Sequence, residues 1–184
     1  MPPVVTSYQI YHNDPDRAAN LANLANIGVA VHKLIQLQDN GNPTVWEFSA
    51  AYYVGADGKR HAFPDSKTFF TWYPDFSSVE SIAPDKLASI PMGASVHYKP
   101  GVKMIKFNTS NKVYAVSLGG QLHWIKTEEV AKSLYGSDWK TKVDDESDAF
   151  YADYTVGSDI ASAADFNVTL QEASASQISA DLGL

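Results

Sequence analysis

The sequence predicts an α+β fold with β dominant, built from two related β-hairpin-plus-short-helix units with flanking strands and a short N-terminal helix. Two observations lead to this prediction. Short stretches rich in β-branched and aromatic residues, typical of strands, are bounded by glycine-containing turns. One such pattern also occurs twice, and a repeat of this kind is typical of scaffolds and binding arrays, because small duplicated units stack to share a core.

The repeat emerges when Tyr52 is aligned with Tyr114, which places His61 on His123. Each copy begins with a strand that ends in a tight turn, Asp-Gly in the first copy and Gly-Gly in the second. Both dipeptides suit primed hairpin turns, which need positive φ angles. We therefore expect a short return strand after each turn.

A short helix is predicted after each hairpin, over residues 66–73 in the first copy and 128–135 in the second. Asp65 and Thr127 directly precede these segments, and their side-chain oxygens can accept hydrogen bonds from the first turn of a helix. Gly136 is placed to end the second helix.

The segment before the repeats combines a strand, a helix and one arm of a hairpin. Residues 4–10 mix β-branched and aromatic residues and predict a strand. Residues 28–54 predict a hairpin with a long second arm, because apolar and polar residues begin to alternate there. One continuous helix over residues 15–38 is the competing interpretation. We favour the strands, because β-branched residues crowd the second half of that range.

The chain is accordingly divided into five segments. They are an N-terminal strand, helix and hairpin arm (1–49), the first repeat (50–96), a connecting strand (97–112), the second repeat (113–160), and a C-terminal strand with an Ala/Ser-rich tail (161–184). The end of the tail is expected to be loosely ordered or weakly helical.

The two terminal strands are candidate elements for self-assembly. The alternation of apolar and polar residues over 166–170 predicts a final strand outside the repeats. A terminal strand either pairs within its own sheet or completes the sheet edge of a neighbouring subunit. The candidate assembly residues are Val4, Tyr8, Ile10, Phe166, Val168 and Leu170.

Composition argues against several classes of function. The net charge is −7, from 21 acidic and 14 basic residues, which disfavours nucleic acids and anionic membrane surfaces as partners. No apolar run is long enough for membrane insertion. The chain has no cysteine, which removes thiolate metal sites and cysteine nucleophiles. The acidic run 144–148 lacks the later glycine and glutamate of a calcium-binding loop, so we predict no metal site.

Aromatic side chains are the main candidates for ligand binding. They make up 12% of the chain, and exposed Trp and Tyr rings can stack on sugars or anchor protein interfaces. Core packing is the alternative role for any one of them. The two equivalent histidines either share a ligand role or hydrogen-bond to the adjacent turn. The candidate ligand-binding residues are Trp46, Trp72, Trp124, Trp139, His61 and His123.

The first copy resembles a small repeat that often occurs in tandem in exported and surface-associated bacterial proteins. The matching residues are Asp57, Gly58, Lys59, Arg60, His61, Phe63, Pro64, Asp65, Thr68, Phe69, Ile82, Leu87, Ile90, Pro91 and Gly93. The second copy keeps Gly119, Gly120, His123, Trp124, Leu134 and Trp139 but lacks the Ile-Pro-x-Gly ending. The resemblance covers residues 50–160, implies an exported, non-enzymatic module of the cell envelope or extracellular space, and transfers no catalytic residue.

We therefore expect a non-enzymatic, exported bacterial structural or adhesive module that self-assembles through its terminal strands into a surface or filament structure. The alternative is a carbohydrate- or cell-wall-binding module that uses exposed aromatics. Expected partners are further copies, other cell-envelope proteins or glycans, and no cofactor is expected. The expected location is extracellular or at the cell surface, although the N-terminus shows no leader pattern. A hydrolase is disfavoured, because the familiar nucleophile and metal motifs are absent from the sequence.

Overall fold

The computed structural model describes residues 14–39 and 50–184. It confirms the predicted α+β class, with 35% helix, 22% strand and two separate sheets. Helices take a larger share than the strand-rich pattern suggested, because much of the C-terminal segment is helical. None of the helices in these two ranges is long and apolar enough to cross a membrane.

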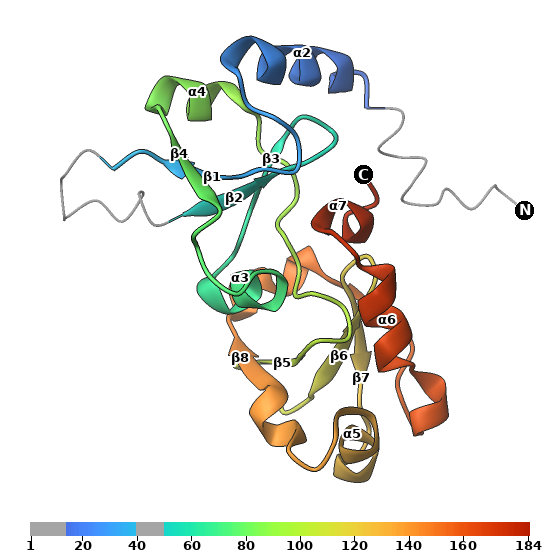
Figure 1. Cartoon of the computed structure of the whole chain (residues 1–184). Coiled ribbons are helices and arrows are strands. Elements are labelled where there is room, and N and C mark those ends of the chain that lie inside the picture. The colour runs from blue at the N-terminus through green and yellow to red at the C-terminus, as the bar shows by residue number, and fades with distance from the viewer. Residues whose placement is uncertain (1–13, 40–49) are drawn as a thin grey trace, which may run out of the picture. The chain divides into compact units, whose positions relative to one another are not determined.

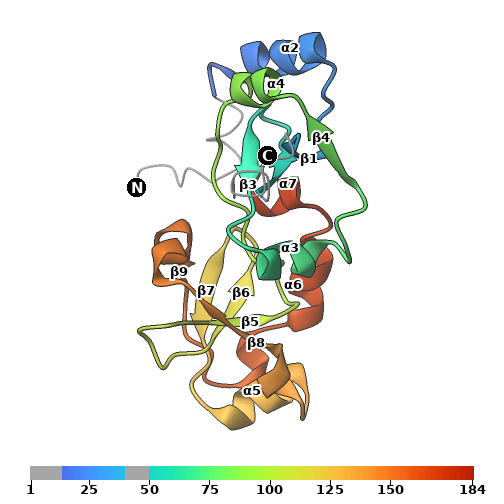
Figure 2. The same cartoon turned by 90° about the vertical axis from the view of Figure 1, so that its left-hand side faces the viewer.

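The described residues form two compact units, and the chain passes between them four times. Unit 1 contains the described residues up to Pro64, residues 73–96 and residues 183–184, and unit 2 contains residues 65–72 and 97–182. Each unit is built around its own sheet (Figures 1 and 2).

Unit 1 has a four-stranded sheet in the order β3-β2-β1-β4. β1 pairs antiparallel with β2 and parallel with β4, and β2 pairs antiparallel with β3. The predicted hairpin is thus confirmed in β1 and β2. The continuous helix is wrong, because Gly28 ends α2 with a left-handed φ of 72°. The elements of unit 1 are α2 (Arg17–Ile27), β1 (Leu34–Leu37), β2 (Ala51–Val54), β3 (Arg60–Ala62), β4 (Val79–Ile82) and α4 (Pro84–Ser89).

The helices α2 and α4 cover one face of this sheet (Figure 1). Leu24 of α2 and Leu87 of α4 pack with Ile35, Val54 and Ile90 in a buried cluster. Burying an aliphatic side chain of this size contributes roughly 1.5–3 kcal/mol, so the cluster is a main source of stability for unit 1.

Unit 2 has a five-stranded sheet in the order β8-β5-β6-β7-β9. β6 pairs antiparallel with both β5 and β7, whereas the outer pairs, β5 with β8 and β7 with β9, are parallel. The elements of unit 2 are α3 (Ser66–Trp72), β5 (Met104–Phe107), β6 (Tyr114–Ser117), β7 (Gln121–Trp124), α5 (Glu128–Tyr135), η2 (Trp139–Lys142), β8 (Val143–Glu146), η3 (Asp148–Asp153), β9 (Thr155–Val156), η4 (Ala163–Asp165), α6 (Val168–Ser174) and α7 (Ile178–Asp181).

Both faces of the second sheet are covered. Successive residues of a strand point to opposite faces, so neighbours in β5 enter different clusters. Met104 packs in a cluster that includes Ala131 of α5. Ile105 and Phe107 pack in another cluster, together with Tyr154.

The two sheets share one pairing scheme. The order β3-β2-β1-β4 in unit 1 matches β7-β6-β5-β8 in unit 2, with the same strand directions. Ile35 lies opposite Tyr52 in unit 1, as Ile105 lies opposite Tyr114 in unit 2. The common scheme therefore includes one strand, β1 or β5, that precedes each repeat segment recognised in the sequence.

The predicted helix ends are confirmed. The backbone N–H of Thr68 donates to Oδ1 of Asp65 at 2.7 Å, at the start of α3. The N–H of Val130 donates to the hydroxyl of Thr127 at 3.3 Å, at the start of α5. Gly136 ends α5 with a φ of 93°, which favours glycine.

The predicted C-terminal strand is wrong. Asn167 caps a helix instead, since its side chain accepts a hydrogen bond from the N–H of Leu170 at 2.9 Å. Val168 is the first residue of α6, and Leu170 is 61% exposed on that helix. Phe166 is extended but buried in the cluster around α5, so it is not free to pair with another chain. The alternation came from a capping residue between apolar neighbours.

Of the two expectations for the end of the tail, the helical one is confirmed. α7 follows α6, and Ala175, Ile178 and Leu182 are buried. Asp181 is buried as well and accepts the backbone N–H of Gly119 at 2.9 Å. The tail is rich in Ala and Ser, so its few larger apolar residues did not indicate a packed helix. Their spacing nevertheless allows a short helix to bury them.

Candidate ligand-binding site

A groove in unit 2 brings together two of the predicted ligand-binding residues, Trp124 and Trp139. It has a volume of about 270 Å³ and lies where the end of β7, the start of α5 and the start of η2 meet. Both tryptophans are half-buried, so each is held by the protein while part of it stays accessible. Two aromatic side chains on one groove provide flat apolar surface on which a ligand ring can stack.

Local structure fixes the two tryptophans. Trp124 is the last residue of β7 and lies opposite Tyr114 in β6. The next residue, Ile125, is buried, and its N–H donates to the carbonyl of Val113 at 3.0 Å. Trp139 begins η2 and packs against the buried cluster around α5.

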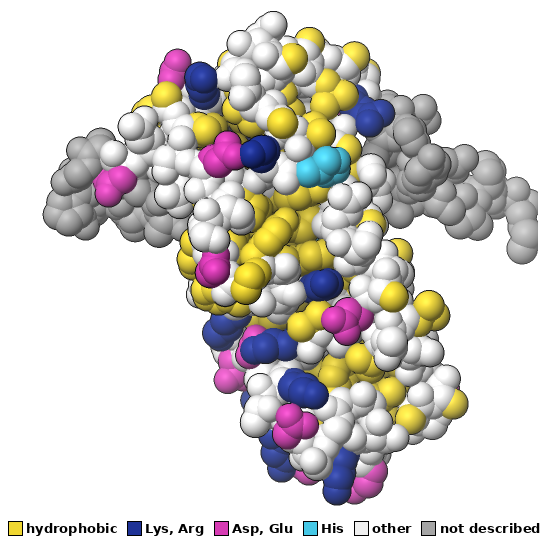
Figure 3. Space-filling view, viewed as in Figure 1, with side chains coloured by type: hydrophobic (Ala, Val, Ile, Leu, Met, Phe, Trp, Pro, Cys, Tyr) yellow, Lys and Arg dark blue, Asp and Glu magenta, His cyan; other side chains and the backbone are white. Residues whose placement is uncertain are grey.

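Three lysine side chains lie over the two indole rings. The ammonium nitrogens of Lys126 and Lys112 are 3.8 and 4.4 Å from the ring centroid of Trp124. The ammonium nitrogen of Lys140 is 5.4 Å from the ring centroid of Trp139. Each such cation–π contact contributes roughly 0.5–1 kcal/mol when it is exposed. On the face of unit 2 that Figure 3 shows, basic and acidic side chains are interspersed.

Two carboxylates accompany the three lysines. Lys126 pairs with Asp159, and the ammonium of Lys140 lies 3.4 Å from Oε2 of Glu128. Lys112 is exposed and forms no salt bridge with any residue that the structure describes. The two indole rings therefore have a local excess of positive charge around them, in a chain whose net charge is −7.

Asn111 supplies an open polar group at the groove. It is exposed, and its side-chain amide makes no hydrogen bond within the described ranges. An amide offers two N–H donors and one carbonyl acceptor. The hydroxyl of Thr127, which also lines the groove, already accepts the N–H of Val130. Asn111 is thus available to bind ligand hydroxyl groups.

Trp72 has a different role. It ends α3, and its indole N–H donates to the carbonyl of His97 at 2.8 Å. The neighbouring Thr71 hydroxyl accepts the N–H of Lys99 at 3.0 Å. These bonds attach α3 to the segment that leads into β5. Trp72 does not line the groove.

His61 is held inside unit 1, where it is 1% exposed. Its Nδ1 lies 2.7 Å from the carbonyl oxygen of Ala94, and its Nε2 lies 3.1 Å from Oδ1 of Asp57. Burial alone would raise the pKa of Asp57, but the hydrogen bond and charge of His61 outweigh it and lower that pKa. Both ring nitrogens are engaged, so the geometry supports the hydrogen-bonding role of His61 and offers nothing for a ligand role.

His123 is the equivalent residue in unit 2. Its Nδ1 lies 2.7 Å from the carbonyl of Ser158, and its Nε2 lies 2.9 Å from the hydroxyl of Ser117. A carbonyl only accepts, so Nδ1 donates and Nε2 accepts the serine O–H. A serine beside a histidine is also the arrangement of a nucleophile and its base. A carboxylate, Asp57, holds the same position on His61, which favours a structural role in both units.

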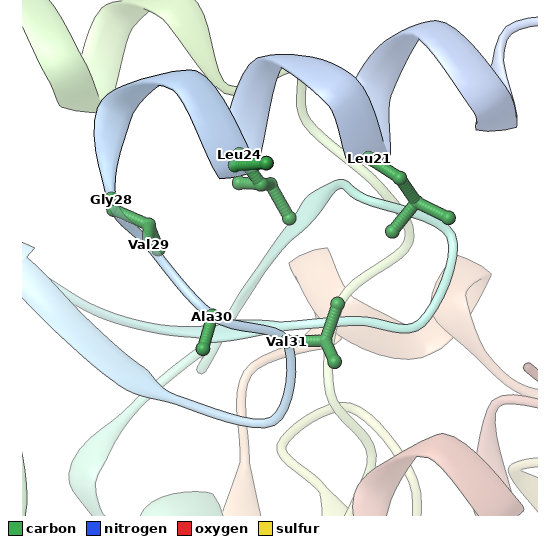
Figure 4. A pocket seen from close by; sticks show the side chains of 7 residues that line it. Leu21, Leu24, Gly28, Val29, Ala30 and Val31 are labelled. Carbon is green, nitrogen blue, oxygen red and sulfur yellow. The ribbon is translucent and has the colours of Figure 1, made fainter.

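A second hollow, in unit 1, is apolar. Leu21 and Leu24 point from α2 toward the loop that carries Val29, Ala30 and Val31 (Figure 4). The hollow has a volume of about 430 Å³, and its lining side chains are all apolar. It offers no polar side chain to orient a ligand.

A third pocket, of about 290 Å³, is aromatic and lies in unit 2. Phe107, Tyr114 and Tyr151 line it beside Asp148. Oδ1 of Asp148 already accepts both the N–H and the hydroxyl of Thr109, at 3.2 and 2.8 Å. Because its carboxylate is engaged, this pocket is a weaker candidate than the tryptophan groove.

Sequence reasoning found the two tryptophans but missed the lysines. Trp124 and Lys126 are two residues apart in an extended segment, so their side chains share a face, and this signal was present in the sequence. Lys112 comes to the same ring from the segment just before β6, which only the register reveals. Four candidates lie outside the described residues: Trp46, Val4, Tyr8 and Ile10.

Comparison of the chain with family models, curated proteins and solved structures found no match. The groove geometry and the sequence resemblance are therefore the basis for assigning a function.

Proposed function

We propose that the chain is a non-enzymatic binding module of the bacterial cell surface, which holds a glycan in the groove of Trp124 and Trp139. The observation that carries the proposal is that two half-buried indoles and the open amide of Asn111 line a single groove. A pyranose ring has an apolar C–H face and polar hydroxyl edges. It can therefore stack on an indole while its hydroxyls bind the amide.

The location and the adhesive role are proposals from the sequence. Residues 50–160 resemble repeats of exported and surface-associated bacterial proteins, and a module of that kind meets polysaccharide wherever it contacts a cell wall. Glycan binding in the groove would give such a module its adhesion. Other cell-envelope proteins are further proposed partners.

Self-assembly through the terminal strands is a separate proposal with less support. The segment 166–170 is not a strand, because Val168 and Leu170 lie in α6 and Phe166 is buried. An edge-pairing mechanism at the C-terminus thus lacks its structural element. The groove is the stronger basis for a function.

The test is a titration of the purified protein with a panel of soluble polysaccharides and their oligosaccharides. Binding is detected by tryptophan fluorescence and by calorimetry. Binding in the groove predicts a saturable signal that Trp124→Ala weakens about tenfold or more, as expected for an aromatic anchor. Asn111→Ala changes an exposed side chain and should weaken binding about threefold to tenfold, the effect of losing one hydrogen bond.

Trp72→Phe is the matched control, because Trp72 is an aromatic residue of the same unit that does not line the groove. Its binding should equal that of the unmodified protein. Equal weakening by Trp72→Phe and Trp124→Ala would contradict the proposal, and so would a panel in which no polysaccharide binds.

A further inference from the structure

Three lysines lie over the rings of Trp124 and Trp139, and only two of them pair with a carboxylate among the described residues. Resting on the proposed function, we infer that the bound glycan is acidic, a chain of pyranose rings that carry carboxylate groups. Lys112 and Lys126 are the residues that recognise this charge. The inference concerns which glycan binds, and its test separates it from the question of whether any glycan binds.

Two ammonium groups lie near one ring. The ammonium nitrogens of Lys126 and Lys112 are 3.8 and 4.4 Å from the ring centroid of Trp124. Asp159 offsets Lys126, whereas no carboxylate of the described residues pairs with Lys112. Both ammonium groups carry positive charge, so a ligand carboxylate near this ring would be attracted by each of them.

The rest of the groove has the same charge pattern. Lys140 lies over Trp139, and its partner Glu128 is 3.4 Å away with both side chains about two-thirds exposed. Exposed pairs of this kind contribute little and exchange partners readily. Three ammonium groups thus face two carboxylates along the two rings. This complementarity favours an anionic ligand even though the whole chain is acidic.

Lysines over an indole have an alternative role, in which they only shield its apolar surface from water. In that role the methylene stem and the cation–π contact matter, and the ligand's charge does not. The two roles predict different binding behaviour. Charge recognition requires that an uncharged form of the same glycan binds more weakly, whereas simple shielding predicts equal binding.

The rings select among anionic polymers. Stacking on Trp124 and Trp139 needs a flat sugar face, which a polyuronate offers at every residue and a glycerol phosphate polymer does not. Lysine is a point charge that attracts carboxylate and phosphate alike. The indoles therefore distinguish the two sources of negative charge, and they favour the carboxylated pyranose chain.

The experiment measures binding of the full chain to three probes at one ionic strength: polygalacturonate, the same polymer fully methyl-esterified, and a poly(glycerol phosphate). We expect polygalacturonate to bind about tenfold more tightly than its ester, the scale of one charge-assisted hydrogen bond. Lys112→Gln should remove about fivefold of the affinity for polygalacturonate and leave that for the ester unchanged. Lys132→Gln is the control, because Lys132 is an exposed lysine of α5 that, unlike Lys112, lies over neither indole ring.

The outcomes separate the two proposals. Equal binding of polygalacturonate and its ester overturns the acidic-glycan inference and leaves the glycan-binding function standing. Stronger binding of poly(glycerol phosphate), or equal losses from Lys112→Gln and Lys132→Gln, also overturns the inference. No binding of any of these probes or of the neutral panel overturns the proposed function and the inference with it.

Discussion

Gly93 leaves open the space that the ring of His61 occupies. A Cβ atom at residue 93 would lie 2.7 Å from Nδ1 of His61, closer than real Cβ contacts allow. Gly157 and His123 repeat this relationship in unit 2, at 2.9 Å from Nδ1. In both units the ring uses that space to bond the carbonyl of the residue that follows the glycine. This shared detail supports the proposal that one unit occurs twice.

Replacing Gly93 by Ala should lower the free energy of unfolding by about 2–3 kcal/mol, because the new methyl group displaces a buried ring and its hydrogen bonds. The measurement is urea-induced unfolding, monitored by circular dichroism, from which the midpoint and the free energy of unfolding are obtained. Gly119→Ala is the control: no atom lies within 4 Å of its Cβ position, and only its φ of 79° opposes the change. That control should cost about 1 kcal/mol, and equal costs at the two positions would show that the clash with His61 is unimportant.

Removing the partner of each equivalent histidine should have unequal effects. Asp57→Ala should cost about 3 kcal/mol, because it leaves the 1% exposed His61 without its buried carboxylate. Ser117→Ala should cost only about 1 kcal/mol, because His123 is half-buried and the lost bond is uncharged. Chemical denaturation of the two variants at pH 7 checks the order, and a larger loss for Ser117→Ala would refute it.

His97 and Asp181 form a buried pair whose stability depends on pH. Nδ1 of His97 lies 2.9 Å from Oδ2 of Asp181, and Nε2 lies 3.0 Å from the carbonyl of Asp153. Burial alone would lower the pKa of His97, but the hydrogen bond to the Asp181 carboxylate outweighs it and raises the pKa above 6.5. A raised pKa contributes stability that is complete below the unfolded value and is lost as pH rises through the folded value.

Asp181→Asn should therefore destabilise the protein most at pH 5.5–6.5, by about 3 kcal/mol, and less at pH 9. At low pH the variant leaves a charged imidazolium without its anion, whereas at high pH both proteins contain a neutral ring. Urea denaturation of both proteins across this range measures the difference. A difference that stays constant with pH would mean that the charge of His97 contributes nothing.

Glu146 is a buried carboxylate that the fold only half satisfies. One oxygen accepts the N–H of Ser147 at 2.9 Å, while Oε2 is buried without a partner. Burial raises the pKa of Glu146, so ionising it costs stability as pH rises above its unfolded value near 4.5. Glu146→Gln should then raise the free energy of unfolding by about 1 kcal/mol at pH 7 and by much less at pH 4. Thermal unfolding of both proteins at the two pH values measures this difference. A variant that is less stable than the unmodified protein at pH 7 would refute the prediction.

The parts of the fold that the sequence predicted correctly are those in which local chemistry and tertiary position agree. Asp65 and Thr127 are good caps wherever they precede a helix, and both cap one here. The change of pattern at residue 28 predicted that no helix continues to residue 38, and Gly28 ends α2 there. Such signals act within one turn of chain, so they can be recognised without knowing the fold.

The errors arose where a local pattern had two physical solutions. Phe166, Val168 and Leu170 alternate as in a strand, but Asn167 is also a strong cap, and the buried residues of the tail, Ala175, Ile178 and Leu182, follow the helix that it starts. Only part of the candidate site could be predicted from the sequence. Trp124 and Trp139 stand out by residue type, whereas the approach of Lys112 to Trp124 depends on register.

The passage of the chain between the two units determines when each unit is complete during synthesis. Unit 2 takes residues 65–72 from within the first repeat, and unit 1 takes residues 183–184 from beyond the second. A gene fragment cut between the repeats, near residue 97, would therefore encode neither unit whole. A ribosome that has translated the first repeat has made most of unit 1, yet both units still lack residues that come after the second repeat.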